Sequence, residues 1–419
     1  MVPEELRLTK HQVRLLSDSD NKESVQILRS KVGETKDYVS SIWSFNGGGG
    51  DSLYRWYGTL PPALVERLLR MYATSHASRI LDPFMGTGVT LRVAGDLGLE
   101  ALGLDSNPLA CLLAEAQLSG IPPRASLLRE LEGVSSGLGP FALDASAQAT
   151  KDLETLISEE RYAYTRKWIR KDTLRALLAL FRQIASVEDE VTQRLFFVAA
   201  AQVVREVASV DARCTHHLVR KQRPFVQPLP QWREKVLETE LVKNHQPMGL
   251  ARVSLKQASV FKADLTDYRP NLVLLHPPYP GVIQYHLIHK LATDFLDVVN
   301  SCLAPVSLRG YDFRYDELKR SDVSTDRVRE YGDFVQALAE LMKALVAPGG
   351  RCVVIMGDQR YRGRVRHPFT EFISSFEESG FSLEEIFIWV LQNNSGMHIQ
   401  RRGHFIDHNY IMVFEDGEE

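Results

Sequence analysis

The sequence has no long hydrophobic run and little cysteine. No apolar stretch in its 419 residues approaches the roughly 20 residues of a membrane span. The polar start, residues 1–21, has no signal-peptide core. The four cysteines are scattered, form no CxxC pair and show no zinc-ligand spacing. We therefore expect a cytoplasmic protein with reduced thiols, no membrane association and no bound metal.

The chain also lacks a strong charge imbalance. Lysine and arginine total 50 against 53 acidic residues, which leaves a net charge of −3. This balance does not indicate a nucleic-acid binder, but it does not exclude one, because local patches decide such binding. The composition, 44% hydrophobic and 25% charged, is that of a folded globular protein. It predicts no oligomeric state.

A glycine-rich turn stands between two expected strands. Residues 78–81 form the first strand, which runs into Asp82-Pro-Phe-Met-Gly-Thr-Gly-Val-Thr90, and residues 89–97 continue as a helix. Gly86 and Gly88 permit a tight turn and let a ligand approach the backbone at the amino end of that helix. A second strand, 100–104, ends on Asp105, where nucleotide-type folds place an acceptor for ribose hydroxyls. This order predicts a doubly wound α/β sheet with a ligand site at the turn.

A second motif ends a buried strand. The apolar run 272–275 predicts a strand covered on both faces, and His276-Pro-Pro-Tyr279 follows it. The two prolines stop the strand and leave backbone carbonyls free to accept hydrogen bonds beside an aromatic ring. Such an end suits a planar base with an exocyclic NH2 group. A proline-rich loop with a core tyrosine is the alternative, and the glycine turn upstream favours the ligand site.

Both motifs resemble those of S-adenosylmethionine-dependent amino-methyltransferases that act on DNA. Residues 82–90 are similar to the family's DPFxGxGxT motif, and residues 276–279 to its (D/N/S)PPY motif. Segments 60–66, 279–290 and 347–358 extend the resemblance. It implies a Rossmann-like methyltransferase sheet, S-adenosyl-L-methionine as cofactor and DNA as partner. The implied reaction methylates cytosine N4 or adenine N6 of a base flipped out of the stack.

The resemblance also implies the site residues. Catalysis falls to His276, Pro277, Pro278 and Tyr279. The cofactor contacts are Pro61, Asp82, Pro83, Phe84, Gly86, Thr87, Gly88, Thr90, Asp105, Ser106, Asn107 and Asp264. In the family, Ser at the first catalytic position points to cytosine and Asp to adenine, so His276 leaves the target base open. Two alternative functions stay open: methylation of an RNA amino group such as guanine N2, with RNA less favoured as partner, and a DNA-binding module without catalysis.

The histidine itself predicts a pH dependence. A neutral imidazole has one nitrogen that can accept a hydrogen bond from the base NH2, whereas an imidazolium has none. We therefore expect methyl transfer to fall as His276 becomes protonated, with an unperturbed pKa near 6.5.

Composition and pattern divide the chain into four parts. Residues 1–50 are expected to form an arm with a glycine hinge, and residues 51–120 the first half of the methyltransferase domain. Residues 121–258 are a mostly helical insertion assigned to target recognition, and residues 259–419 complete the domain. Within these parts we expect a partial loop at 127–155, helices at 162–185 and 191–210, and a strand at 259–264 that ends on Asp264. Strands at 386–392 and 410–414 are expected to pair antiparallel at the sheet edge.

Basic residues gather in three places. One lies at residues 161–175, along the first half of the expected helix 162–185; the other two are a cluster in the insertion and an alternating run that we expect to be extended, with its side chains on one face. The nucleic-acid contacts predicted from the last two are Arg220, Lys221, Arg223, Arg360, Arg362 and Arg364. Such clusters hold duplex phosphates. The alternative for each is a solvated surface.

Overall fold

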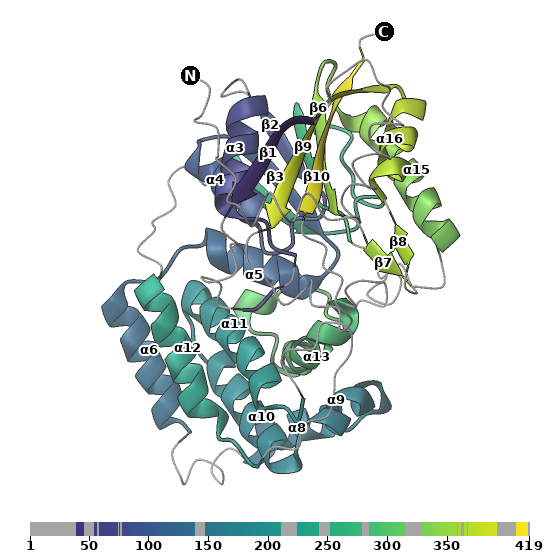
Figure 1. Ribbon diagram of the computed structural model, residues 1–419. Coiled ribbons are helices and arrows are strands. Elements are labelled where there is room, and N and C mark those ends of the chain that lie inside the picture. Colours follow the sequence, from purple (N-terminus) through teal and green to yellow (C-terminus); the bar gives the residue numbers. More distant parts are fainter. Residues whose placement is uncertain are drawn as a thin grey trace, which may run out of the picture.

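The computed structural model describes residues 39–45, 54–56, 58–73, 75, 78–138, 147–210, 224–242, 252–278, 285–314, 328–357, 359–361, 364–366, 368–391 and 408–417. Within these residues the protein has two lobes, a sheet flanked by helices and a bundle of helices (Figure 1). We call them the sheet lobe and the helical lobe. No helix in this part of the chain is both long and apolar enough to cross a membrane.

The sheet lobe is built on a sheet whose described part has eight strands, in the order β1-β9-β10-β6-β5-β2-β3-β4. The strands are β1 (Val39–Phe45), β2 (Arg79–Asp82), β3 (Glu100–Asp105), β4 (Val253–Gln257), β5 (Leu272–Leu275), β6 (Arg351–Gly357), β9 (Phe381–Leu391) and β10 (His408–Asp416). The strands from β4 to β6 are parallel, and β10 runs antiparallel to both β6 and β9. The predicted doubly wound α/β sheet and its antiparallel terminal pair are confirmed.

Both faces of the sheet are covered by helices (Figure 1). Helices α3 (Pro62–Tyr72) and α4 (Val89–Asp96) lie on one face, and α15 (Val328–Leu345) and α16 (Pro368–Glu378) lie on the other. Successive residues of a strand point to opposite faces. Leu272 accordingly packs in the core under α3 and α4, and its neighbour Val273 packs in the core under α15 and α16. Burial on both faces explains why this strand is apolar throughout.

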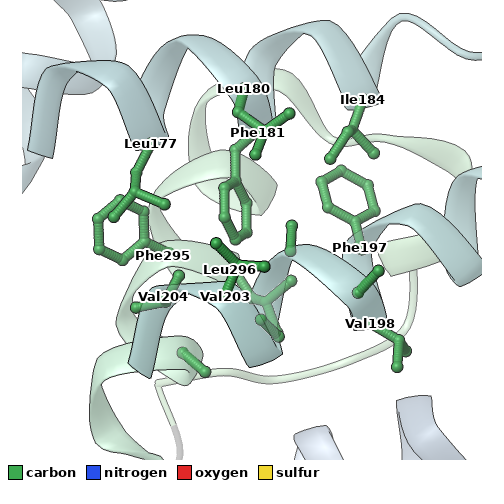
Figure 2. Close-up of a cluster of buried hydrophobic side chains, with 14 of the residues drawn as sticks. Leu177, Leu180, Phe181, Ile184, Phe197, Val198, Val203, Val204, Phe295 and Leu296 are labelled. Atoms are coloured by element: carbon green, nitrogen blue, oxygen red, sulfur yellow. The ribbon is translucent and has the colours of Figure 1, made fainter. Parts of the chain in front are cut away.

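The helical lobe is built mainly from the predicted insertion. Its elements are α6 (Arg124–Ser136), α8 (Ala147–Ile157), η1 (Glu160–Tyr162), α9 (Ala163–Trp168), α10 (Lys171–Ala185), α11 (Glu190–Val207), α12 (Pro228–Val242), α13 (Tyr285–Leu303) and η3 (Val306–Leu308). Helix α11 is buried on nearly all sides, so it is the central helix of the bundle. Its side chains meet those of α10 and α13, where Phe181, Phe197 and Phe295 pack together (Figure 2).

Helix α5 (Pro108–Leu118) joins the two lobes. Its Cys111 and Ala114 belong to the core beneath the sheet, whereas Leu109, Leu112 and Leu113 belong to the core of the helical lobe. A polar contact supports the junction: Glu115 on this helix lies 3.3 Å from Arg194 on α11. The lobes therefore share a continuous apolar connection.

Three expectations about the fold are wrong. Residues 39–45 of the expected arm form β1, which pairs in parallel with β9 at the sheet edge. The helix expected at 162–185 is divided, because α9 ends at Trp168 and α10 begins at Lys171. No strand forms at 259–264: residues 260–262 form a turn, and the strand that pairs with β3 is the earlier β4. The partial loop expected at 127–155 agrees with the turn at residues 137–138 between α6 and α8.

Candidate active site

The sheet changes direction at the boundary between β2 and β5. From β2 the chain proceeds outward through β3 to β4, whereas β5 and β6 lie on the opposite side of β2. In open parallel sheets the crevice at such a switch point, beyond the carboxyl ends of the strands, is where ligands bind. The glycine turn follows β2, Asp105 ends β3 and His276 follows β5. Both sequence motifs therefore lie at one edge of the sheet.

The glycine turn has the backbone that its sequence predicts. Gly86 and Gly88 have φ of +51° and +79°, in the left-handed region that favours glycine. A Cβ added at Gly88 would lie 2.8 Å from the Cβ of Ala114, so the absent side chain also lets α4 and α5 pack closely. The amide of Met85 donates to the Leu104 carbonyl at 3.0 Å, which ties the turn to β3.

Asp82 and Thr90 brace this turn from inside. Asp82 is buried, accepts a hydrogen bond from the Phe84 amide at 3.1 Å, and is hydrogen-bonded by the Thr90 side chain. Burial raises the pKa of Asp82 to about 6, because the charged form loses its hydration, and the two hydrogen bonds oppose this change. The geometry thus gives both side chains a role in shaping the turn.

Asp105 connects the turn to the next strand. Its Oδ2 accepts from the Gly86 amide at 3.0 Å and its Oδ1 accepts from the Asn107 amide at 2.8 Å. Burial raises the pKa of Asp105 to about 7, and the negative charge of Asp82 acts in the same direction. Asn107 then caps α5, since its Oδ1 accepts from the Leu109 amide at 3.0 Å. A half-buried carboxylate with a raised pKa in a crevice is typical of a functional site.

His276 lies at the end of β5, where burial lowers its pKa to about 4. A hydrogen bond with the Gly58 backbone acts in the opposite direction, as an acceptor for a ring N–H would. The expected titration near 6.5 is therefore wrong, because the protein around the ring disfavours the imidazolium. His276 is neutral at the pH of a cell, with one ring nitrogen able to accept a hydrogen bond.

Asp264 does not end a strand. It is exposed in the loop after β4, and its carboxylate accepts from the amide and hydroxyl of Thr266, at 3.2 and 2.9 Å. These bonds lower its pKa. The same loop carries Phe261, which packs edge to face on Phe334 of α15 with ring centroids 5.7 Å apart. Phe84 of the glycine turn packs on Phe334 from another side, at 6.2 Å. Sequence reasoning missed this aromatic cluster, because its members come from three separate segments.

A second missed group lies on the segment before α3. Trp56 stacks on His289 of α13, with ring centroids 4.2 Å apart and planes 2° from parallel. The hydroxyl of Tyr54 forms a hydrogen bond of 2.8 Å with Nδ1 of the same histidine. The aromatic run Tyr54-Arg-Trp-Tyr57 is visible in the sequence. Its histidine partner is not, because it lies more than two hundred positions away.

The structure tests neither the role predicted for Tyr279 nor the predicted nucleic-acid contacts. Tyr279, Arg220, Lys221, Arg223 and Arg362 lie outside the described residues, as do the side chains of Arg360 and Arg364. The backbone of the last group is not one extended run: β7 (Gln359–Tyr361) and β8 (Arg364–Arg366) pair antiparallel. All these contacts stay predictions.

In the basic segment 161–175, which is divided among η1, α9 and α10, acceptors neutralise much of the charge. Arg170 pairs with Asp172 at 2.8 Å, and Arg175 pairs with Glu154 at 3.0 Å. Such surface pairs leave less positive charge for phosphates than the sequence suggests.

Comparison with known proteins agrees with the site. The family model described as DNA methylase matches residues 7–116, a range that includes the glycine turn and Asp105. The predicted resemblance to DNA amino-methyltransferases is confirmed. Type II methyltransferase M.MvaI of Kocuria varians is 20% identical over 313 residues, which cover 68% of this chain and 65% of that protein. Type II methyltransferase M.MjaII of Methanocaldococcus jannaschii is 36% identical over 66 residues, 16% of this chain and 12% of that protein.

These alignments span less than two thirds of the length of either relative. Among solved structures, the rRNA methyltransferase aviRa from Streptomyces viridochromogenes covers 87% of this chain and 90% of its own, at 14% identity and a TM-score of 0.30. A TM-score of that size carries no inference about substrate. The residues at the switch point nevertheless fit a nucleoside-bearing methyl donor, with two glycines in the turn beside a half-buried strand-end carboxylate.

Proposed function

We propose that the protein is a DNA methyltransferase that uses S-adenosyl-L-methionine to methylate an exocyclic amino group, cytosine N4 or adenine N6. One observation carries this proposal: the glycine turn with Asp105 and the His276-Pro-Pro end of β5 occupy the two sides of the switch point. The first is suited to a nucleoside, and the second presents acceptors suited to a base NH2. The DNA methylase match supports the same substrate class.

The cofactor would be held by the residues around the turn. Asp105 would accept from ribose hydroxyls, while Gly86 and Gly88 would let the donor approach the backbone and the amino end of α4. The cofactor, when bound, would supply an activated methyl group. Asp82 and Thr90 contribute by fixing the turn, and Pro61 sits at the start of α3, where its carbonyl accepts from the Leu64 and Val65 amides.

The acceptor base would be oriented by the end of β5. The Pro277 carbonyl would accept one hydrogen of the NH2 group, and the neutral imidazole of His276 would accept the other. Together they would hold the nitrogen lone pair toward the methyl donor, so catalysis rests on orientation in a preformed site. The stacking of the base on Tyr279 remains a prediction.

The proposal is tested by incubating the protein with tritiated S-adenosylmethionine and either DNA or RNA. The nucleic acid is then digested, and the labelled nucleoside is identified by mass spectrometry. We expect N4-methylcytosine or N6-methyladenine from DNA, and a lower rate for His276→Ala with little change in cofactor affinity. If the label appeared in RNA and not in DNA, the substrate would be RNA. Cofactor binding without transfer to either would reduce the protein to a binding module.

A further inference from the structure

The segment 54–60, which precedes α3, touches both sides of the candidate active site. We call this segment the strap; Tyr57 lies outside its described part. At one end of the site, a Cβ added at Gly86 would lie 3.3 Å from Nε1 of Trp56, so the indole edge lies against the glycine turn. At the other, the Gly58 backbone is hydrogen-bonded to His276. Trp56 and Gly58 of the strap therefore contact the two motifs on either side of the switch point.

The same strap is fastened to the helical lobe. Tyr54 is buried in the core of that lobe and is hydrogen-bonded to His289. The backbone amide of Arg55 donates to Oε1 of Gln202 on α11 at 3.0 Å. Trp56 stacks face to face on His289, which is itself 1% exposed on α13. These anchors come from two helices of the helical lobe, α11 and α13.

The contacts form one continuous line from the helical lobe to the candidate ribose acceptor. His289 supports the indole plane of Trp56, Trp56 abuts Gly86, and the amide of Gly86 donates to Asp105. Gly86 has no side chain and a positive φ. The position of its amide therefore depends on the groups that pack against it. A displacement of the indole would move this amide and with it the carboxylate that it holds.

We propose that Trp56 and His289 are positioning residues that set the cofactor turn from the helical lobe. Neither side chain is assigned a part in methyl transfer itself. Trp56 fixes the Gly86 amide and the orientation of Asp105, and His289 fixes Trp56. The inference rests on the proposed function, because the ligand that reports the position of Asp105 is S-adenosylmethionine.

The first test is the affinity for S-adenosylmethionine, measured by calorimetry on the full-length protein. Contacting residues couple energetically, so Trp56→Ala and His289→Ala should each weaken binding about tenfold, and the double variant no more than either alone. Trp56→Phe, which keeps an aromatic plane on His289, should restore affinity to within about threefold of wild type. Trp168→Ala on α9, remote from the strap, should leave affinity unchanged.

A merely structural role predicts a different pattern. In that case the two alanine variants would melt at a lower temperature but bind the cofactor as wild type does, which would overturn the proposal. A protein whose wild type binds no S-adenosylmethionine would overturn the proposed function as well. Normal wild-type binding with unchanged variants would overturn this inference alone.

Tryptophan fluorescence provides a second test that does not require the alanine variants to fold. Cofactor binding should change the emission of the wild type and of Trp168→Phe, because Trp56 lies against the turn that the cofactor would occupy. Trp56→Phe should lose most of this change while it still binds the cofactor. An equal change in Trp56→Phe would show that the indole does not sense the turn and would contradict the proposal.

Discussion

Buried and half-buried carboxylates in the two lobes have different surroundings. In the helical lobe, Asp294 pairs with Lys290 at 2.9 Å and accepts from the Thr165 hydroxyl at 2.5 Å. Asp297, one turn later, accepts from the Tyr162 hydroxyl at 2.5 Å. In the sheet lobe, Asp82 and Asp105 accept hydrogen bonds from backbone amides and, for Asp82, from one threonine, and neither forms an ion pair within the described residues.

This difference separates packing from chemistry. A lysine near Asp294 opposes the effect of burial on its pKa, which is the arrangement expected of a structural pair. For Asp105, hydrogen bonds from two backbone amides oppose the effect of burial, and the nearby charge of Asp82 adds to it. The pKa of Asp105 rises to about 7. Groups shifted in this way, and gathered at a crevice, are typical of a functional site, which is why the proposed reaction is assigned to the sheet lobe. The helical lobe supplies anchors, and the sheet lobe supplies acceptors.

The largest expected effect comes from a substitution in the hydrophobic core of the helical lobe. Phe295 of α13 is fully buried against α10 and α11 (Figure 2). Phe295→Ala should lower the free energy of unfolding by about 3–5 kcal/mol, because it leaves a cavity. Urea unfolding followed by hydrogen exchange should show that both lobes lose protection together, since α5 joins their cores. Phe261→Ala, at an exposed position, is the matched control. Loss of protection in the helical lobe alone would show that the lobes unfold separately.

The second prediction separates the two kinds of carboxylate. Asp105→Ala should weaken S-adenosylmethionine binding by about 1.5–3 kcal/mol, the cost of losing hydrogen bonds to a charged acceptor. Asp294→Asn should lower the melting temperature without changing this affinity. Calorimetry and thermal unfolding of both variants provide the test. Unchanged affinity in a folded Asp105→Ala protein would remove Asp105 from the cofactor site.

The third prediction uses the raised pKa of Asp105. The ionised carboxylate is the stronger acceptor for ribose hydroxyls, and it predominates above pH 7, where it has lost its proton. Cofactor affinity should therefore be about tenfold weaker at pH 6 than at pH 8, following the ionised fraction. Asp105→Asn should bind weakly at both values with little difference between them. A wild-type affinity that is constant over this range would contradict the assignment.

The fourth prediction concerns the contact between the lobes. Arg194 is 5% exposed and lies 3.3 Å from Glu115 and 2.5 Å from Glu190. Glu115→Gln should lower stability by about 1 kcal/mol, since Arg194 keeps its second carboxylate and Tyr311 can still donate to the amide oxygen. Thermal unfolding measures the loss. A loss of 3 kcal/mol or more would mean that this pair, and not the apolar face of α5, holds the lobes together.

The smallest expected effect is that of protons on His276. Its pKa of about 4 keeps the ring neutral from pH 5.5 to 8. Methyl transfer at saturating cofactor should therefore show the same pH dependence over this range in wild type and in His276→Asn, which keeps a carbonyl acceptor. If the wild-type rate fell on acidification near pH 6.5 and the His276→Asn rate did not, His276 would be the group that titrates there.

The motifs were readable because their chemistry is local. The turn from Asp82 to Thr90 needs two glycines within three residues, and a strand stopped by two prolines can be recognised from its own letters. The same locality let the antiparallel terminal strands be predicted. Asp264 shows the limit of this approach: a carboxylate after an apolar run looked like a strand end, but the pairing partner of β3 is the earlier, half-exposed segment Val253–Gln257.

The sequence alone thus determined the α/β class of the sheet, the glycine turn with Asp105, and the proline-stopped strand that ends at His276, because backbone conformation and periodic burial depend on neighbouring residues. Only the tertiary structure decided the rest. It recruited α13 into the helical lobe, placed β1 at the sheet edge and brought Trp56 between His289 and Gly86. It also lowered the pKa of His276 and raised that of Asp105, since desolvation depends on everything that packs around a group. Contacts between segments hundreds of residues apart have no local signature.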